Sequence, residues 1–311
     1  MEHLNQTSVT YFIIKGISDA PEFQALIFCL VLLIYIISIA GNMTIVILVC
    51  LDPHLQTPMY FFLCNLSLMD ISSITATLHN VFVIFIVGDN KVSFRGCITQ
   101  MFLFLCFTGN ELSILSVMSY DRYVAICNPL RYQTLMNQRV CMIMATVSWM
   151  FGFLQAIPHI SLVCGFTCYI SNEINHFFCD IVPLMQITCS DTSVLELFIL
   201  TWSNILSGLT PYLLTGIPYF FIISTILKIH SSTGRQKAFY TCSSHITVVV
   251  LLYVTLFCQY LRPMSMNNLN SKKLISLFNT VAVPVLNPLI YSLKNKDVKS
   301  ALGQRLTLCN V

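Results

Sequence analysis

The sequence predicts an all-α membrane protein, a single domain over residues 1–311 built as a bundle of seven transmembrane helices. Hydrophobic residues make up 56% of the chain and charged residues only 9%, whereas a soluble domain has about a quarter charged residues. Mean hydropathy is +0.77. A long apolar window must be helical, because lipid offers backbone groups no water. The predicted spans cover approximately residues 24–50, 58–87, 95–128, 139–163, 195–228, 236–261 and 272–293.

The apolar windows contain few charges, which supports each span. The second contains Asp70 and the third contains Glu111, while the cores of the other windows are uncharged. The first window is longer than the core of a signal peptide, so we expect it to be retained. The sequence shows no internal repeat of the kind that transporters have.

The distribution of basic residues predicts an extracellular N-terminus and a cytoplasmic C-terminus. Asn5 begins an Asn-Gln-Thr glycosylation sequon on the outer side. The net charge of +3, without a basic cluster, excludes nucleic acid as a partner. Ten of the 16 Lys and Arg residues fall on the predicted inner side: Arg122, Arg131, Arg139, Lys228, Arg235, Lys237, Lys294, Lys296, Lys299 and Arg305.

Five cysteines fall on the predicted outer side, where the compartment is oxidising and favours disulfides. They are Cys97, Cys164, Cys168, Cys179 and Cys189. Five is odd, so at least one thiol is left unpaired or buried. The residues alone do not determine the connectivity.

Four motifs carry a family resemblance. They are Pro58–Leu63 (PMYFFL), Met118–Cys127 (MSYDRYVAIC), Lys237–His245 (KAFYTCSSH) and Pro284–Tyr291 (PVLNPLIY). In this order they resemble the signature set of vertebrate odorant receptors, within the rhodopsin-like G-protein-coupled family. The resemblance implies a small, neutral, largely apolar odorant as ligand and an olfactory stimulatory G protein that raises cyclic AMP. It also implies a multi-pass protein in the plasma membrane of olfactory sensory cilia.

The motifs at the inner ends of the third and seventh spans predict an activation switch. Asp121 stands beside Arg122 at the membrane boundary, where an ion pair can hold one of two states; a positive-inside anchor is the alternative for Arg122. Pro288 lacks a backbone donor, so Asn287-Pro288 is a hinge candidate, although proline is common in spanning helices. With the resemblance, the switch residues are Asp121, Arg122, Tyr123, Tyr219, Asn287, Pro288 and Tyr291.

Asp70 and Glu111 are the carboxylates well inside the spans, and charge there is expensive enough to suggest a function. Glu111 lies 11 residues before Arg122, about three helical turns, so both project from one helix face. The resemblance implies a Na⁺ ion at these two acids, with no other cofactor required. The alternatives are a proton shared by the two carboxyls, or hydrogen bonds to Asn42 and Asn287.

The resemblance also pairs cysteines. It implies disulfides Cys97–Cys179 and Cys168–Cys189, with Cys164 as the spare thiol, although Cys168 stands one residue further from Cys179 than the family pattern has it. His176, three residues before Cys179, has two interpretations: a Zn or Cu ligand, or a packed side chain beneath the disulfide-tied loop.

A ligand site in such a bundle is expected between helices, with apolar walls and a few polar groups. Residues 96–110 contain no acid that could pair with a protonated amine, which disfavours an aminergic ligand. Residues 274–293 contain no lysine that could form a Schiff base with retinal. Ordinary packing is the alternative for each residue that the resemblance places at the ligand. These are Phe104, Leu105, Thr108, Gly109, Leu112, Ser203, Asn204, Ser207, Tyr253, Leu256, Phe257, Tyr260, Leu277 and Thr280.

The chain departs from the family pattern near its inner half. Pro218 and Tyr240 each replace a usual serine, and Pro211 precedes Pro218, so we expect two bends in the fifth span. Residues 294–306 predict a short amphipathic helix on the inner leaflet. Rival functions are a rhodopsin-like receptor for another ligand and a transporter or channel. The sequence does not predict an enzyme, since no Ser/His or His/Glu pair stands at a suitable spacing within a span.

Overall fold

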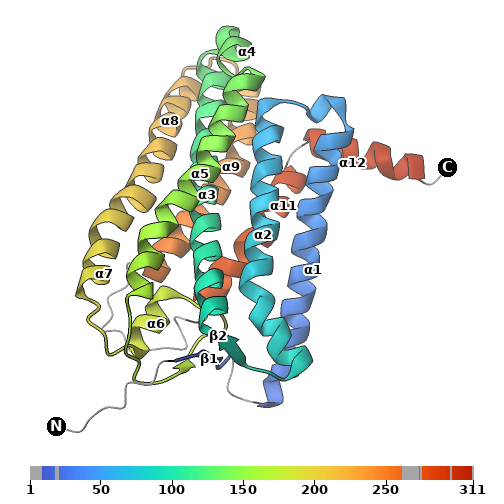
Figure 1. Cartoon of the computed structure of the whole chain (residues 1–311). Coiled ribbons are helices and arrows are strands. Elements are labelled where there is room, and N and C mark those ends of the chain that lie inside the picture. Colours follow the sequence, from blue (N-terminus) through green and yellow to red (C-terminus); the bar gives the residue numbers. More distant parts are fainter. Residues whose placement is uncertain (1–8, 18–20, 261–272, 274, 295, 310–311) are drawn as a thin grey trace.

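The structure is a computed structural model that describes residues 9–17, 21–260, 273, 275–294 and 296–309. Asn5 lies outside these residues. Within them, the helices fall into seven segments that lie side by side (Figure 1), which confirms the predicted bundle. The segments are α1 (Pro21–Leu51), α2 (Pro58–Val87), α3 (Phe94–Cys127), α5 (Gln138–Cys164), α7 (Ser193–Phe198) continuing through η3 (Ile199–Leu209) into α8 (Thr210–Leu227), α9 (Ser232–Tyr260), and η4 (Phe278–Ala282) continuing into α11 (Val283–Lys294).

Length and composition agree with a membrane location. Among the described residues, five of these segments are long and apolar enough to cross a bilayer, namely α1, α2, α3, α5 and the composite fifth segment. Helix α9 contains a shorter apolar stretch, His245–Phe257.

The two ends of the bundle carry different small elements. At one end lie α6 (Ile181–Ile187) and a sheet of order β2-β1-β3, made of β1 (Tyr11–Ile14), β2 (Lys91–Ser93) and β3 (Glu173–Ile174). Strand β1 is antiparallel to β2 and parallel to β3. At the other end lie η1 (Pro53–Leu55), η2 (Pro129–Arg131), α4 (Tyr132–Leu135) and α12 (Lys296–Cys309) (Figure 1). Strand β1 and helix α12 therefore lie at opposite ends, as an odd number of spans requires.

Local sequence signals set several helix ends. The Ser93 side chain accepts a hydrogen bond from the Gly96 N–H at 3.1 Å and caps α3, and the Asn137 side chain caps α5 in the same way. Pro58 occupies the first turn of α2, where its missing N–H costs nothing. Gly88 ends α2 in the left-handed conformation, with φ 75°.

The fifth segment widens before Pro211. Residues Ile199–Leu209 form a π-helix, and the Thr210 hydroxyl donates to the carbonyl of Ile205 at 2.9 Å. Proline cannot donate to the preceding turn and its ring clashes with a carbonyl there, and a wider turn gives that carbonyl room. Helix α8 continues through Pro218.

Candidate functional site

The two interior acids meet beside the seventh segment. Asp70 of α2 and Glu111 of α3 are buried, and both accept from the amide of Asn287. The Asn287 Nδ2 lies 3.2 and 3.0 Å from the Asp70 carboxylate oxygens and 3.5 Å from Glu111 Oε1. The structure thus brings the two acids to a single amide, that of Asn287, which donates to both.

Helix α1 contacts the backbone beside Pro288, the hinge candidate. The carbonyl of Pro284 lies four residues earlier and receives no donor from Pro288. Ser38 Oγ and Asn42 Nδ2 donate to it instead, at 3.1 and 2.9 Å. Asn42 therefore bonds the hinge carbonyl, and not the acids as one alternative proposed. Gly41 permits the approach, because a Cβ there would lie 3.1 Å from the Pro288 ring.

The inner ion pair joins two neighbours on α3. The Arg122 guanidinium pairs with the Asp121 carboxylate, with Nε 2.9 Å from Oδ2. The Tyr132 hydroxyl of α4 donates to Asp121 Oδ1 at 2.8 Å. The Asp121 side chain is fully buried and Arg122 is 13% exposed. Arg122 is therefore held by its neighbour Asp121, which α4 holds in turn.

A second inner contact joins α8 to α9. The Tyr219 hydroxyl lies 2.6 Å from His245 Nδ1, and the two rings stack. Tyr123 packs against the cluster that contains Tyr219 and Cys242. The sequence motif contained His245 but did not assign it a switch role. Its signal was a histidine within an apolar stretch. The side chain of Tyr291, another predicted switch residue, lies outside the described part.

The outer half contains a polar seam between α5 and η3, which we define as Gln155, His159, Ser203 and Ser207. His159 Nε2 lies 2.6 Å from the Ser203 hydroxyl, and the Ser207 hydroxyl donates to Gln155 Oε1. Gln155 Nε2 also donates to the carbonyl of Leu105 on α3 at 3.0 Å. Sequence reasoning identified the two serines and missed Gln155 and His159. Two polar residues spaced by four in an apolar span were the available signal.

The predicted ligand residues of α3 differ in how deeply they are buried. Phe104 and Leu112 are buried, and Phe104 packs against Phe178 of the outer loop. Gly109 contacts α5, since a Cβ there would lie 2.1 Å from Gln155 Nε2. Leu105 and Thr108 are half-buried. Gly109 is thus a packing position, because no side chain fits between the helices.

The structure contradicts the prediction that Phe257 contacts the ligand. Its side chain is 63% exposed and continues a stripe with Val250 and Val254, which are also exposed. It therefore faces lipid, whereas Tyr253 and Leu256 are half-buried and pack against the core. One residue turns a helix by about 100°, which is enough to move a side chain from interior to lipid.

The other predicted ligand residues vary. Asn204 is half-buried and its amide donates back to Leu200 at 3.1 Å. Thr280 is buried, and its hydroxyl donates to the carbonyl of Ser276. Leu277 packs against the apolar cluster that contains Phe104 and Phe178. The side chain of Tyr260 lies outside the described part.

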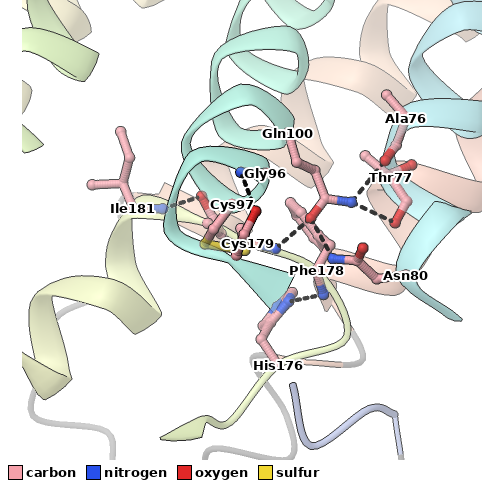
Figure 2. The surroundings of a disulfide bond; sticks show 12 residues. Ala76, Thr77, Asn80, Gly96, Cys97, Gln100, His176, Phe178, Cys179 and Ile181 are labelled. Atoms are coloured by element: carbon pink, nitrogen blue, oxygen red, sulfur yellow. Dashed lines mark hydrogen bonds between the residues drawn. A yellow bond between two sulfur atoms is a disulfide. The ribbon is translucent and has the colours of Figure 1, made fainter. Parts of the chain in front are cut away.

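Disulfides close the outer end. Cys97 bonds Cys179, and Cys168 bonds Cys189, while Cys164 is free and exposed. Figure 2 shows Gln100 beside the first bond, where its Oε1 accepts from the Cys179 N–H at 2.9 Å and from the Asn80 amide at 2.7 Å; its amide donates to the carbonyl of Ala76 on α2. The outer loop is thus fixed to α2 and α3.

His176 packs beneath this loop. Its ring stacks on Phe177, and its Nδ1 accepts from the Phe178 N–H at 3.4 Å (Figure 2). Burial and, to a smaller extent, the positive charge of Lys273 lower the pKa of His176 to about 3. Among the described residues no three His, Cys, Asp or Glu side chains gather around a metal position. His176 is therefore a packed side chain beneath the disulfide-tied loop.

The chain matches the family of olfactory receptors over residues 28–308. It is 44% identical to Homo sapiens olfactory receptor 8K3 over 317 residues, which cover 100% of this chain and 99% of the relative. It is 45% identical to Homo sapiens olfactory receptor 13C9, with coverage of 97% and 96%. Mus musculus olfactory receptor 5AR1 is 42% identical, with 97% of each chain covered.

A solved structure, squid rhodopsin, has a similar fold. The TM-score is 0.68 at 20% sequence identity, and the match covers 94% of this chain and 87% of the other. At this identity the likeness concerns the fold alone.

Proposed function

The chain belongs to the olfactory receptor family, and on that premise we propose where its ligand binds and how binding reaches the G protein. Members of this family are odorant receptors that raise cyclic AMP through a G protein, and the chain shares this function. The observation that carries the assignment is the family match over residues 28–308, on a rhodopsin-like fold.

The ligand is a small, neutral and largely apolar molecule that lies between the outer halves of α3, η3 and α9. Thr108, Ser203 and Ser207 supply hydroxyls, and Tyr253 and Leu256 supply mostly apolar surface. These side chains are half-buried and come from different segments. Such a mixture of apolar walls and few hydroxyls suits a neutral molecule with one polar group.

Ligand binding then changes the inner contacts. The pair Tyr219–His245 holds the inner ends of α8 and α9 together, and the pair Arg122–Asp121 holds the Arg122 side chain against α3. Separation of α8 and α9 breaks the Tyr219–His245 pair and frees Tyr219, and a break in the Arg122–Asp121 pair frees Arg122, for a G protein of the olfactory stimulatory type. A contact that exists in only one of two states is the element a switch requires.

A Na⁺ ion at Asp70 and Glu111 is the proposed cofactor. Carboxylate oxygens suit hard cations, and one Na⁺ plus one proton would neutralise both acids. Sodium should raise the melting temperature of purified receptor more than potassium does, because a ligand of the folded state stabilises it. Asp70→Asn should abolish that difference. Equal effects of both cations on the original protein would favour the shared proton.

We place the receptor in the plasma membrane, and by family in olfactory sensory cilia. Asn5 is the proposed glycan site on the outer side. On the inner side, the Arg305 guanidinium donates to the carbonyl of Leu51 at 2.7 Å, which ties α12 to the end of α1, where it can lie on membrane lipid.

The test is a cyclic AMP assay in cells that display the receptor, with a panel of neutral volatile molecules. Leu256→Ala should raise the half-maximal concentration of an active compound, because it removes apolar surface at the ligand. Phe257→Ala is the matched control, since that ring faces lipid. Equal effects of the two variants would contradict the proposed site. Ion currents without ligand, in cells that lack G-protein signalling, would favour the transport alternative.

A further inference from the structure

The polar seam fixes which hydrogen atoms Ser203 and Ser207 can offer. Each serine hydroxyl has one proton to donate and two lone pairs that accept. A ligand that contacts these hydroxyls therefore meets a donor or an acceptor according to where each proton already points.

The proton of Ser207 points to Gln155. Gln155 Nε2 faces the carbonyl of Leu105, which can only accept, so this atom is the amide nitrogen. The other amide atom is therefore the oxygen, and Ser207 donates its proton to it. Only lone pairs of Ser207 remain for a ligand.

The proton of Ser203 points to His159 by the same reasoning. His159 Nδ1 lies 2.9 Å from the carbonyl of Gln155, so Nδ1 is the protonated nitrogen. The ring is buried and no acid pairs with it in the described part of the chain, so it is neutral, because an unpaired buried charge is costly. Its Nε2 is then an acceptor, and the Ser203 proton goes to it at 2.6 Å, in preference to the carbonyl of Phe198 at 3.4 Å.

We propose that Gln155 and His159 are positioning residues that leave the hydroxyls of Ser203 and Ser207 as acceptors, so that the receptor selects odorants bearing a hydroxyl over ketones and ethers of the same skeleton. This inference rests on the proposed ligand site. A ligand hydroxyl donates to Ser203 or Ser207, and its oxygen can accept from the hydroxyl of Thr108, which makes no side-chain hydrogen bond within the described residues. A ketone or an ether offers only an acceptor and therefore donates to neither serine hydroxyl.

The experiment compares matched triplets such as cyclohexanol, cyclohexanone and methoxycyclohexane, or borneol, camphor and bornyl methyl ether. The readout is the ratio of half-maximal concentrations within a triplet, measured by cyclic AMP and corrected for surface display. In the original receptor the alcohol should be favoured by about tenfold, which corresponds to about 1.4 kcal/mol.

Variants distinguish a hydrogen-bonding role from a structural one. Gln155→Leu and His159→Leu release a serine proton, so the preference for alcohols should fall several-fold, whereas His159→Gln retains an acceptor and should preserve it. Ser148→Ala is the control, because it removes the 3.1 Å bond between Ser113 and Ser148 that also joins α3 to α5. Since a Leu variant can lose surface display, Ser207→Ala provides an independent comparison in which the preference should also decrease.

Two results would overturn the inference. The first is a ketone or ether as potent as its alcohol in the original receptor. The second is an unchanged ratio in Gln155→Leu, His159→Leu and Ser207→Ala. A displayed receptor that responds to neither alcohols nor ketones would instead contradict the proposed function, and the inference with it.

Discussion

Replacing Gly152 by alanine should force α3 and α5 apart. A Cβ at this position would lie 1.8 Å from Asn110 Oδ1 and 2.4 Å from the carbonyl oxygen of Cys106. The amide of Asn110 can rotate, but the carbonyl belongs to the α3 backbone and cannot. The helices would have to separate by about 1 Å to restore van der Waals contact.

Overpacking of this kind costs about 1–3 kcal/mol. For a chain of 311 residues, about 2 kcal/mol corresponds to a melting temperature lower by roughly 3 °C. Gln155 lies about one turn further along α5, so the same displacement should weaken its bond to Leu105. The variant should therefore also lose part of its preference for alcohols.

The assay is thermal unfolding of detergent-purified receptor, followed by the fluorescence of a thiol-reactive dye. Gly216→Ala is the matched control, because a Cβ there meets nothing within 4 Å and alanine favours a helix by up to about 1 kcal/mol. Equal melting temperatures for the two variants would refute the close approach of α3 and α5.

Three further predictions concern the outer loop and the switch. Cys97→Ser should block glycan maturation and surface display, whereas Cys164→Ser should alter neither, because only the first thiol is bonded; similar surface labelling of both variants would count against a structural disulfide. Arg122→Gln should abolish the cyclic AMP response while the receptor still reaches the surface, and an undiminished response would contradict the switch role. His176 has a pKa of about 3 in the folded chain, lowered by burial and by Lys273, against 6.5 in the unfolded chain. The unfolded chain thus binds more protons below about pH 6.5, so the stability contributed by neutral His176 is complete above that pH and declines by about 1.4 kcal/mol per unit toward about pH 3. Melting curves over this range should show a steeper decline for the original receptor than for His176→Asn, and parallel curves would exclude the effect.

The membrane architecture could be predicted because it follows from composition. Scarce charge and seven apolar windows require helices wherever lipid surrounds the chain. Asp70 and Glu111 were recognised for the same reason, since a carboxylate inside a span is too costly to be incidental. The structure then shows that Asn287 is the group that bonds both.

The residues of the proposed ligand site were harder to predict from the sequence. Leu256 and Phe257 are adjacent and both apolar, so hydropathy does not distinguish them, yet one packs inward and the other is 63% exposed. Nothing in the sequence around Gly109 indicates that α5 packs directly against it. These outcomes depend on how each helix is rotated about its axis, which is set by its neighbours in the bundle.

The sequence by itself predicted seven membrane crossings and the side that each end faces, and it carried the motifs of the receptor family. These properties follow from the cost of moving each residue into lipid and from motifs contiguous along the chain. The tertiary structure decided which partners the buried polar groups find, such as His159 for Ser203 and Asn42 for the carbonyl of Pro284. Those partners are far apart in sequence, and a hydrogen bond forms only where packing brings donor and acceptor within about 3 Å.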